Sequence, residues 1–234
     1  MKDFLWGLIE PFYNAVFMNQ GYLAYAEGIK NTLLISLMAV AIGIIIGVLV
    51  AVVRVISSKI RGLHWLGKLC GIYVTVIRGT PVMVQLLIIY NMIFTSRDSN
   101  PLLCAGICFG INSGAYVAEI IRGGIESIDK GQTEAGRSLG FNDLQTMRYI
   151  ILPQAFRNAL PALGNEFIVL VKESSVASVI AVSDLTKMAQ YIGSRTWDIV
   201  PPLVVAALCY LVIVMILTKL LSLLERRMSR GDRN

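Results

Sequence analysis

The chain has 234 residues, of which 56% are apolar and only 15% charged, and its formal net charge is +6. A water-soluble domain carries about a quarter charged residues, so this composition excludes an ordinary soluble protein. The cations lie at the ends of apolar runs and form no aromatic-interleaved basic patch, which argues against nucleic-acid binding.

The N-terminal segment, residues 1–28, is rich in apolar and aromatic side chains but is interrupted by charged residues. This pattern predicts an amphipathic helix at the lipid headgroups that is too short and too polar to cross the membrane. The first long apolar run begins near residue 32 and leads into a basic loop, which does not fit a cleaved signal peptide. We therefore assign residues 29–225 to a membrane domain and residues 226–234 to a basic tail.

Four apolar stretches contain no Asp, Glu, Lys or Arg, and each approaches the roughly 17 to 25 residues that a helix needs to cross hydrocarbon. They are residues 32–53, 79–96, 102–118 and 199–218. A fifth stretch, residues 155–171, is largely apolar but contains Arg157 and Glu166. The sequence thus predicts an all-α membrane protein with five transmembrane helices plus the N-terminal interfacial helix.

Basic residues are concentrated after the first predicted span, after the third, and in the C-terminal tail. Positive charge marks the cytoplasmic side of a membrane, so these three regions are expected in the cytoplasm. With five spans, the N-terminus is then outside and the C-terminus inside.

Three charged residues lie near the same predicted cytoplasmic edge. Arg78 precedes the second span, and Glu119 and Arg122 are three residues apart at the end of the third. We interpret them as an interfacial salt-bridge cluster. Direct contact with a solute is the alternative.

The loop between the third and fourth spans, residues 122–153, is long for a connector, and long loops are uncommon unless they have a function. Residues 131–139 read as a short helix. Gly140 follows and can adopt the left-handed conformation that ends a helix.

A second helix is predicted directly afterwards. Asn142 is a good N-cap and Gln145 stands three residues later, which is the spacing of a capping box. The helix is expected to stop at Pro153. The two helices together would form a docking element on the cytoplasmic face.

Seven residues of this loop follow one another at fixed spacing: Glu134, Ala135, Gly136, Gly140, Ile150, Leu152 and Pro153. They resemble the EAA motif of ATP-binding-cassette importer permeases, with Gly136 where Ala is usual. Flanking segments are similar to the polar amino acid permease subfamily, namely residues 78–81, 116–125, 131–132, 165–167 and 172–175. The resemblance covers about residues 28–225.

The resemblance implies a type I (MetI-like) ABC importer domain in the cell membrane of a prokaryote, carrying basic or glutamine-like amino acids inward by alternating access. It also implies two ATPase subunits, a second permease copy or a paralogue, an extracytoplasmic amino-acid-binding protein, and contact with membrane lipid. Five residues would couple the loop to the ATPase: Glu134, Ala135, Gly136, Leu139 and Gly140. Alternatively, Glu134 is a solvated acid at a helix start, favoured there by the helix dipole.

The fourth span carries polar residues that we expect on one helical face: Asn165, Glu166, Glu173 and Ser174. Ionisable groups inside a bilayer need a partner, a wet cavity or a function. Our hypothesis is that these residues line a solute path suited to an ammonium or guanidinium group. In the alternative, Lys172 or Arg157 neutralises Glu166, and Glu173 lies at the outer surface.

No G-x-x-x-x-G-K-[ST] loop occurs in the chain, so ATP and Mg are expected on the partner ATPase, with no catalytic residue, metal site or cofactor here. The cysteines lack metal spacing and are predicted to be small buried thiols: Cys70, Cys104, Cys108 and Cys209. One alternative is the same mechanism with another small polar solute. A passive channel or signalling subunit is a further alternative, which would share the topology but needs no docking loop. An intramembrane hydrolase would need a nucleophile paired with a base, which no span shows.

Overall fold

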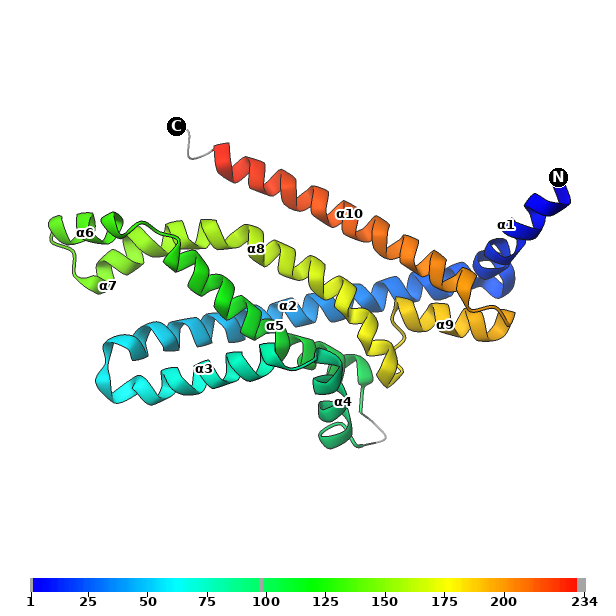
Figure 1. Cartoon of the computed structure of the whole chain (residues 1–234), viewed down its shortest axis with the longest axis horizontal. Helices are drawn as coiled ribbons and strands as arrows, with labels where there is room; N and C mark the ends of the chain where they lie inside the picture. Colours follow the sequence, from blue (N-terminus) through cyan, green and yellow to red (C-terminus); the bar gives the residue numbers. More distant parts are fainter. Residues whose placement is uncertain (1, 97–98, 231–234) are drawn as a thin grey trace. The chain divides into compact units, whose positions relative to one another are not determined.

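The computed structural model describes residues 2–96 and 99–230, and the regular elements among them are all helices (Figure 1). The α-helices are α1 (Lys2–Phe17), α2 (Gly21–Lys59), α3 (His64–Gly79), α4 (Val82–Met92), α5 (Pro101–Glu126), α6 (Lys130–Ser138), α7 (Asp143–Thr146), α8 (Leu152–Glu173), α9 (Leu185–Thr196) and α10 (Val200–Arg230). The short elements are the 3-10 helices η1 (Met18–Gln20), η2 (Arg61–Leu63) and η4 (Ser174–Ile180), and the π-helix η3 (Met147–Ile151). The predicted all-α fold is confirmed.

The chain folds into two compact units. Unit 1 is made of residues 1–39, 82–109 and 168–218, and unit 2 of residues 40–81, 110–167 and 219–234. The chain passes from one unit to the other inside α2, α5, α8 and α10, and between α3 and α4.

Three helical segments of the described chain are long and apolar enough to cross a membrane: residues 9–58, residues 101–126 and residues 200–228. The number becomes four if α3 and α4 together form one interrupted span. α8, which contains the fifth predicted span, does not reach the same hydropathy. The count of five spans therefore stays a prediction.

The predicted second span, residues 79–96, is wrong as a continuous helix. α3 ends at Gly79 and α4 begins only at Val82, with Thr80 in an extended conformation (φ −122°, ψ 145°). A proline clashes with a helical residue before it, so Pro81 forces Thr80 out of the helix. α3 also occupies residues that we had expected in a basic loop.

In unit 1 the N-terminal helix α1 packs onto α2, α9 and α10 around a small core. The buried members of this core are Ala15, Tyr25, Leu185, Ala189, Ile192 and Ala206. Several large side chains of α1 remain exposed, namely Ile9, Phe12, Tyr13 and Phe17. Such an uncovered apolar face is what a helix lying at the lipid headgroups requires.

In unit 2 the second half of α2 lies close against α5. A methyl group added at Gly43 would lie 2.7 Å from the Ser113 Oγ, and one at Gly47 would collide with the side chain of Val117. Small residues allow two helix backbones to approach in this way, as is common between membrane helices.

The cysteines are free thiols and only partly follow the prediction. Cys104 and Cys108 are buried, whereas Cys70 and Cys209 are half-buried.

Candidate functional site

The cytoplasmic loop predicted from the sequence is a helical hairpin within unit 2 (Figure 1). Its first helix, α6, begins one residue earlier than expected, because the side chain of Asp129 accepts a hydrogen bond from the Gly131 N–H and caps it. α6 ends at Ser138, and Gly140 has a φ of +82°. The glycine therefore has the left-handed conformation that the sequence predicts.

The capping box at the start of α7 is present as predicted. The Asn142 Oδ1 accepts a hydrogen bond from the Gln145 N–H at 2.9 Å, and the Gln145 Oε1 accepts one from the Asn142 N–H at 2.9 Å. These two hydrogen bonds are formed within the chain, so the turn between the two helices is stabilised without a partner.

The predicted stop at Pro153 is wrong. α7 continues through the π-helix η3 into α8, which begins at Leu152 and runs through Pro153. The Leu152 N–H donates to the Met147 carbonyl, five residues back. A wider π turn before the proline accommodates the ring and the missing N–H, so the helix need not end there.

Gly136 lies where α6 touches the second helix of the hairpin. It is buried, and a methyl group there would meet the Thr146 Cγ2 at 2.8 Å and the Ile150 Cδ1 at 3.0 Å. Arg137 and Asp143 join the two helices from outside with a salt bridge of 3.0 Å. Gly136 therefore packs inside the hairpin, between its two helices.

The outer side of the hairpin carries uncovered apolar side chains. Leu139 is 74% exposed, Leu144 78% and Tyr149 61%. Glu134, Ala135 and Gly140 are exposed beside them. We call these six residues the coupling surface.

Glu134 is the fifth residue of α6, and the first turn of that helix contains no acidic residue. Its carboxylate has no ion-pair partner among the residues that the structure describes. The interpretation of Glu134 as a dipole-favoured acid at a helix start therefore loses its basis, since this effect is confined to the first turn.

The predicted charge cluster is present in unit 2 and is larger than expected. The Glu119 carboxylate accepts hydrogen bonds from Arg122, at 2.8 and 3.0 Å, and from the Arg54 Nη1 at 2.6 Å. Arg78 lies 3.7 Å from the same carboxylate and stacks over the Tyr116 ring at 5.1 Å. One acid thus holds together the ends of α2, α3 and α5, and we had not assigned Arg54 to the cluster.

The predicted path residues fall into both units. In unit 2, Glu166 is buried and accepts a hydrogen bond from the Ser113 Oγ at 2.8 Å, while Asn165 is exposed. In unit 1, α8 ends at Glu173, and Ser174 opens η4 with its Oγ donating to the Val171 carbonyl. The expected α-helical face therefore does not continue to Ser174.

Ser113 was missed in the sequence, although a signal was available. Asn112 and Ser113 are adjacent polar residues in an otherwise apolar predicted span. In a membrane helix such a pair indicates a polar partner on another helix.

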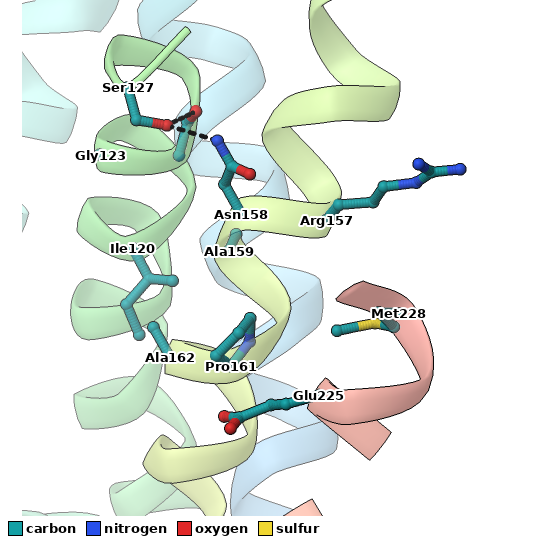
Figure 2. A pocket seen from close by; sticks show the side chains of 11 residues that line it. Ile120, Gly123, Ser127, Arg157, Asn158, Ala159, Pro161, Ala162, Glu225 and Met228 are labelled. Atoms are coloured by element: carbon teal, nitrogen blue, oxygen red, sulfur yellow. Dashed lines mark hydrogen bonds between the residues drawn. The ribbon is translucent and has the colours of Figure 1, made fainter. Parts of the chain in front are cut away.

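A cleft of about 800 Å³ opens in unit 2 between α5, α8 and α10. Figure 2 shows Asn158 pointing to Ser127 on one wall, and the Glu225 side chain extending toward Pro161 from α10. The Asn158 Nδ2 donates to the Ser127 Oγ at 2.9 Å. Ala162 lines the cleft three residues before Asn165, so both lie on one side of α8.

Unit 1 contains a buried polar group that no sequence pattern indicates. Asp184 is fully buried and caps α9 by accepting from the Thr186 N–H at 3.0 Å and the Lys187 N–H at 3.1 Å. The Tyr210 hydroxyl donates to it at 3.3 Å, and the Thr32 Oγ1 accepts from the Leu185 N–H at 3.2 Å. We call Thr32, Asp184, Thr186 and Tyr210 the Asp184 cluster.

Asp184 lies outside the candidate membrane spans. Burial raises the pKa of its carboxyl, and the hydrogen bonds from Lys187, Thr186 and Tyr210 oppose that shift without cancelling it.

Comparison with known proteins gives consistent matches. Residues 43–230 match the family described as binding-protein-dependent transport system inner membrane component. The putative glutamine transport system permease protein GlnP of Rickettsia bellii is 39% identical over 88% of this chain and 93% of its own length. The arginine transport system permease protein ArtQ of Bacillus subtilis is 38% identical over the same shares.

Solved structures of ABC transporters are also similar to this chain. A crystal structure of an amino acid ABC transporter with histidines is similar with a TM-score of 0.82 and 44% identity, covering 90% of this chain and 96% of that one. The MetNI methionine ABC transporter in an inward-facing conformation has a TM-score of 0.73 at 20% identity over 92% and 99% of the two chains, which shows a shared fold.

Proposed function

The chain belongs to the family of binding-protein-dependent transport system inner membrane components, and we propose that it imports polar amino acids by alternating access. As a permease of this family it is the transmembrane, non-catalytic subunit of an amino acid ABC transporter. The observation that carries the proposal is the coupling surface: a capped, self-supporting hairpin that leaves Leu139, Leu144 and Tyr149 uncovered.

Energy for transport comes from a partner in this proposal. Two ATPase subunits hold ATP and Mg, and each receives one hairpin in a groove. Leu139 and Leu144 supply the apolar contact, Glu134 meets a basic or polar group, and Gly140 permits close approach of the two backbones. Gly136 keeps the hairpin rigid, so that movement of the ATPase is passed on to α8.

The solute follows the polar residues of α8. The Glu166 carboxylate and Asn165 supply acceptors for an ammonium or guanidinium group, and the cleft lined by Ala162 serves as the opening toward the cytoplasm. Glu173 and Ser174 contribute at the other end of the path. Relatives are named for glutamine and for arginine, and a structural neighbour was crystallised with histidines, which supports a polar substrate with a basic or glutamine-like side chain.

The remaining assignments follow from charge and from the family. The chain lies in the cell membrane with its N-terminus outside and its C-terminus in the cytoplasm, and α1 rests at the lipid headgroups. A second permease, identical or paralogous, completes the path, and an extracytoplasmic binding protein delivers the amino acid.

The test is uptake into proteoliposomes that contain the permease, its ATPase and its binding protein. Labelled arginine, histidine and glutamine are offered with and without ATP to the wild type, to Glu166→Gln and to Ser113→Ala. We expect ATP-dependent accumulation by the wild type, and a changed preference among the three amino acids in Glu166→Gln.

Ser113→Ala is the matched control, because it removes the hydrogen bond to Glu166 but leaves the carboxylate in place. If Glu166→Gln transports all three as the wild type does, Glu166 is not part of the path. Equilibration of solute without ATP would instead identify a passive channel.

A further inference from the structure

Unit 1 contains a cavity of about 540 Å³, open to the surface, that no part of the proposed path uses. Its walls come from η1 and the first turns of α2 on one side, and from the residues around α9 on the other. This volume lies within the range of roughly 300 to 1,000 Å³ that small-molecule sites occupy.

Two opposite charges face this cavity from different helices. Glu27 lies on α2, and Lys187 lies on the first turn of α9. No ion pair joins them, and neither side chain has an ion-pair partner among the residues that the structure describes. The cavity wall therefore carries one acceptor and one donor of full charge that are not paired with each other.

The remaining wall combines apolar and polar surface. Leu23 stands one turn before Glu27 on α2, and Tyr191 stands one turn after Lys187 on α9. Met188 also lines the cavity. The Arg195 guanidinium lies over the Tyr191 ring, 4.9 Å from its centre. A side chain with an apolar stem and a polar end would fit beside these groups.

The backbone around the cavity is unusual. Among described residues other than glycine, the left-handed conformations are Asn19 (φ 50°), Gln20 (φ 59°), Ala181 (φ 59°) and Trp197 (φ 57°). The first three of these line the cavity. Such conformations are unfavourable for side-chain-bearing residues and cluster at binding sites, where the surrounding fold imposes them.

We propose that this cavity is a second amino acid site, in which Lys187 binds the α-carboxylate and Glu27 binds the α-ammonium of a zwitterionic solute. The site rests on the proposed function for its solute and for its position on the outer side of the membrane. It would hold an amino acid before that solute enters the path along α8. A neutral sugar or a lone anion would use only part of this charge arrangement, so a zwitterion fits it best.

The experiment is equilibrium binding to the purified full-length permease in detergent, without binding protein or ATP. The probes are labelled L-glutamine and L-arginine, together with agmatine, which lacks the carboxylate of arginine, and N-acetyl-L-glutamine, which lacks the ammonium. All variants are made in a Glu166→Gln background, so that the Glu166 carboxylate contributes to none of the measured binding.

We expect Lys187→Met and Glu27→Gln each to weaken binding of L-glutamine and L-arginine by about tenfold or more, because each removes a hydrogen bond to a charged group. Agmatine binding should be insensitive to Lys187→Met, and N-acetyl-L-glutamine binding insensitive to Glu27→Gln. Lys30→Met is the matched control: Lys30 is exposed on α2 but does not line the cavity, so its variant should bind like the parent.

Two outcomes would overturn the proposal: no amino acid binding by the parent chain, or equal effects of the three variants. Failure here leaves ATP-dependent uptake intact, whereas a chain that binds amino acids but shows no ATP-dependent uptake contradicts the proposed function alone.

Discussion

The coupling surface in unit 2 and the Asp184 cluster in unit 1 place polar and apolar groups in opposite ways. At the coupling surface, leucines and a tyrosine are exposed while the capping groups are satisfied within the hairpin. In the Asp184 cluster, a carboxylate is fully buried and surrounded by donors from its own chain. The exposed side chains of the coupling surface can still make apolar contacts with another molecule. The polar groups of the Asp184 cluster already have their hydrogen-bond partners within the chain.

This difference is what we expect if the coupling surface binds a partner and the Asp184 cluster stabilises the fold. An exposed cluster of apolar side chains gains free energy only when another molecule covers it. A buried carboxylate, in contrast, is tolerated only when hydrogen bonds already satisfy it. Substitutions at the coupling surface should therefore change association and leave folding intact, and substitutions in the Asp184 cluster should do the reverse.

The largest effect is expected from Leu139→Asp combined with Leu144→Asp. Each leucine is a candidate hot spot whose loss costs about 2 kcal/mol or more, so the pair should weaken ATPase binding by a factor of several hundred or more. Thermal unfolding should hardly change, because exposed positions contribute little to stability. The check is co-purification and titration with the ATPase.

Leu139→Ile with Leu144→Ile is the matched control, since it keeps the apolar area. If the aspartate pair lowers the unfolding temperature as strongly as it lowers ATPase affinity, the coupling surface is structural and the comparison fails.

In the Asp184 cluster, Asp184→Ala should destabilise the fold by about 3 kcal/mol, because it leaves two helix N–H groups and the Tyr210 hydroxyl without their acceptor. Asp184→Asn keeps a capping oxygen and should cost much less. Thermal unfolding in detergent measures both, and equal losses for the two variants would rule out the hydrogen bonds as the cause.

Comparison of the wild type with Asp184→Asn gives a pH dependence of stability with a definite sign. Because burial raises the pKa of Asp184 in the folded state, its contribution to stability is fully present below the unfolded pKa of about 4. It is then lost as the pH rises through the raised folded pKa. The unfolding temperature of the wild type relative to Asp184→Asn should therefore fall with rising pH, and a rise would contradict this assignment.

A smaller loss is expected from Gly140→Val. A β-branched residue at a φ of +82° costs about 2 kcal/mol of local strain, which the hairpin can relieve by shifting its turn. Uptake should fall several-fold while the protein stays folded. Gly71→Ala on α3, where added atoms meet nothing, is the control that should transport like the wild type.

The smallest effect should come from Gln145→Ala. It removes one half of the capping box and costs less than about 1 kcal/mol, so the hairpin should fray without unfolding. Hydrogen exchange at the Asn142 amide would report this local change. An unaltered exchange rate at that amide would show that the Gln145 side chain does not stabilise the start of α7.

The features that could be predicted from sequence are those set by nearest neighbours. Gly140 and the Asn142–Gln145 box depend on a few consecutive residues, and the structure has both. The end at Pro153 failed because the preceding π turn compensates for the proline. The break at Thr80 was missed for the opposite reason: the apolar composition of residues 79–96 concealed a local clash before Pro81.

The partners of buried groups could not be predicted, since they are far apart in the chain. Ser113 reaches Glu166 over 53 positions, and Arg54 reaches Glu119 over 65. No local sequence pattern marks Asp184 as a buried residue, because the packing of α2, α9 and α10 is what buries it. Sequence patterns show that polar and charged residues in a membrane domain need a partner, because their burial in lipid is unfavourable. They do not show which residue is that partner.

The most direct test of the coupling surface is site-specific cross-linking to the ATPase in the assembled transporter. In a chain with Cys70, Cys104, Cys108 and Cys209 replaced by alanine, Leu144→Cys is compared with Val212→Cys, which is exposed on an apolar stretch of α10. We predict that position 144 cross-links to the ATPase and position 212 does not. A transporter that remains active but shows no cross-link at 144, or equal cross-links at both positions, would contradict the account.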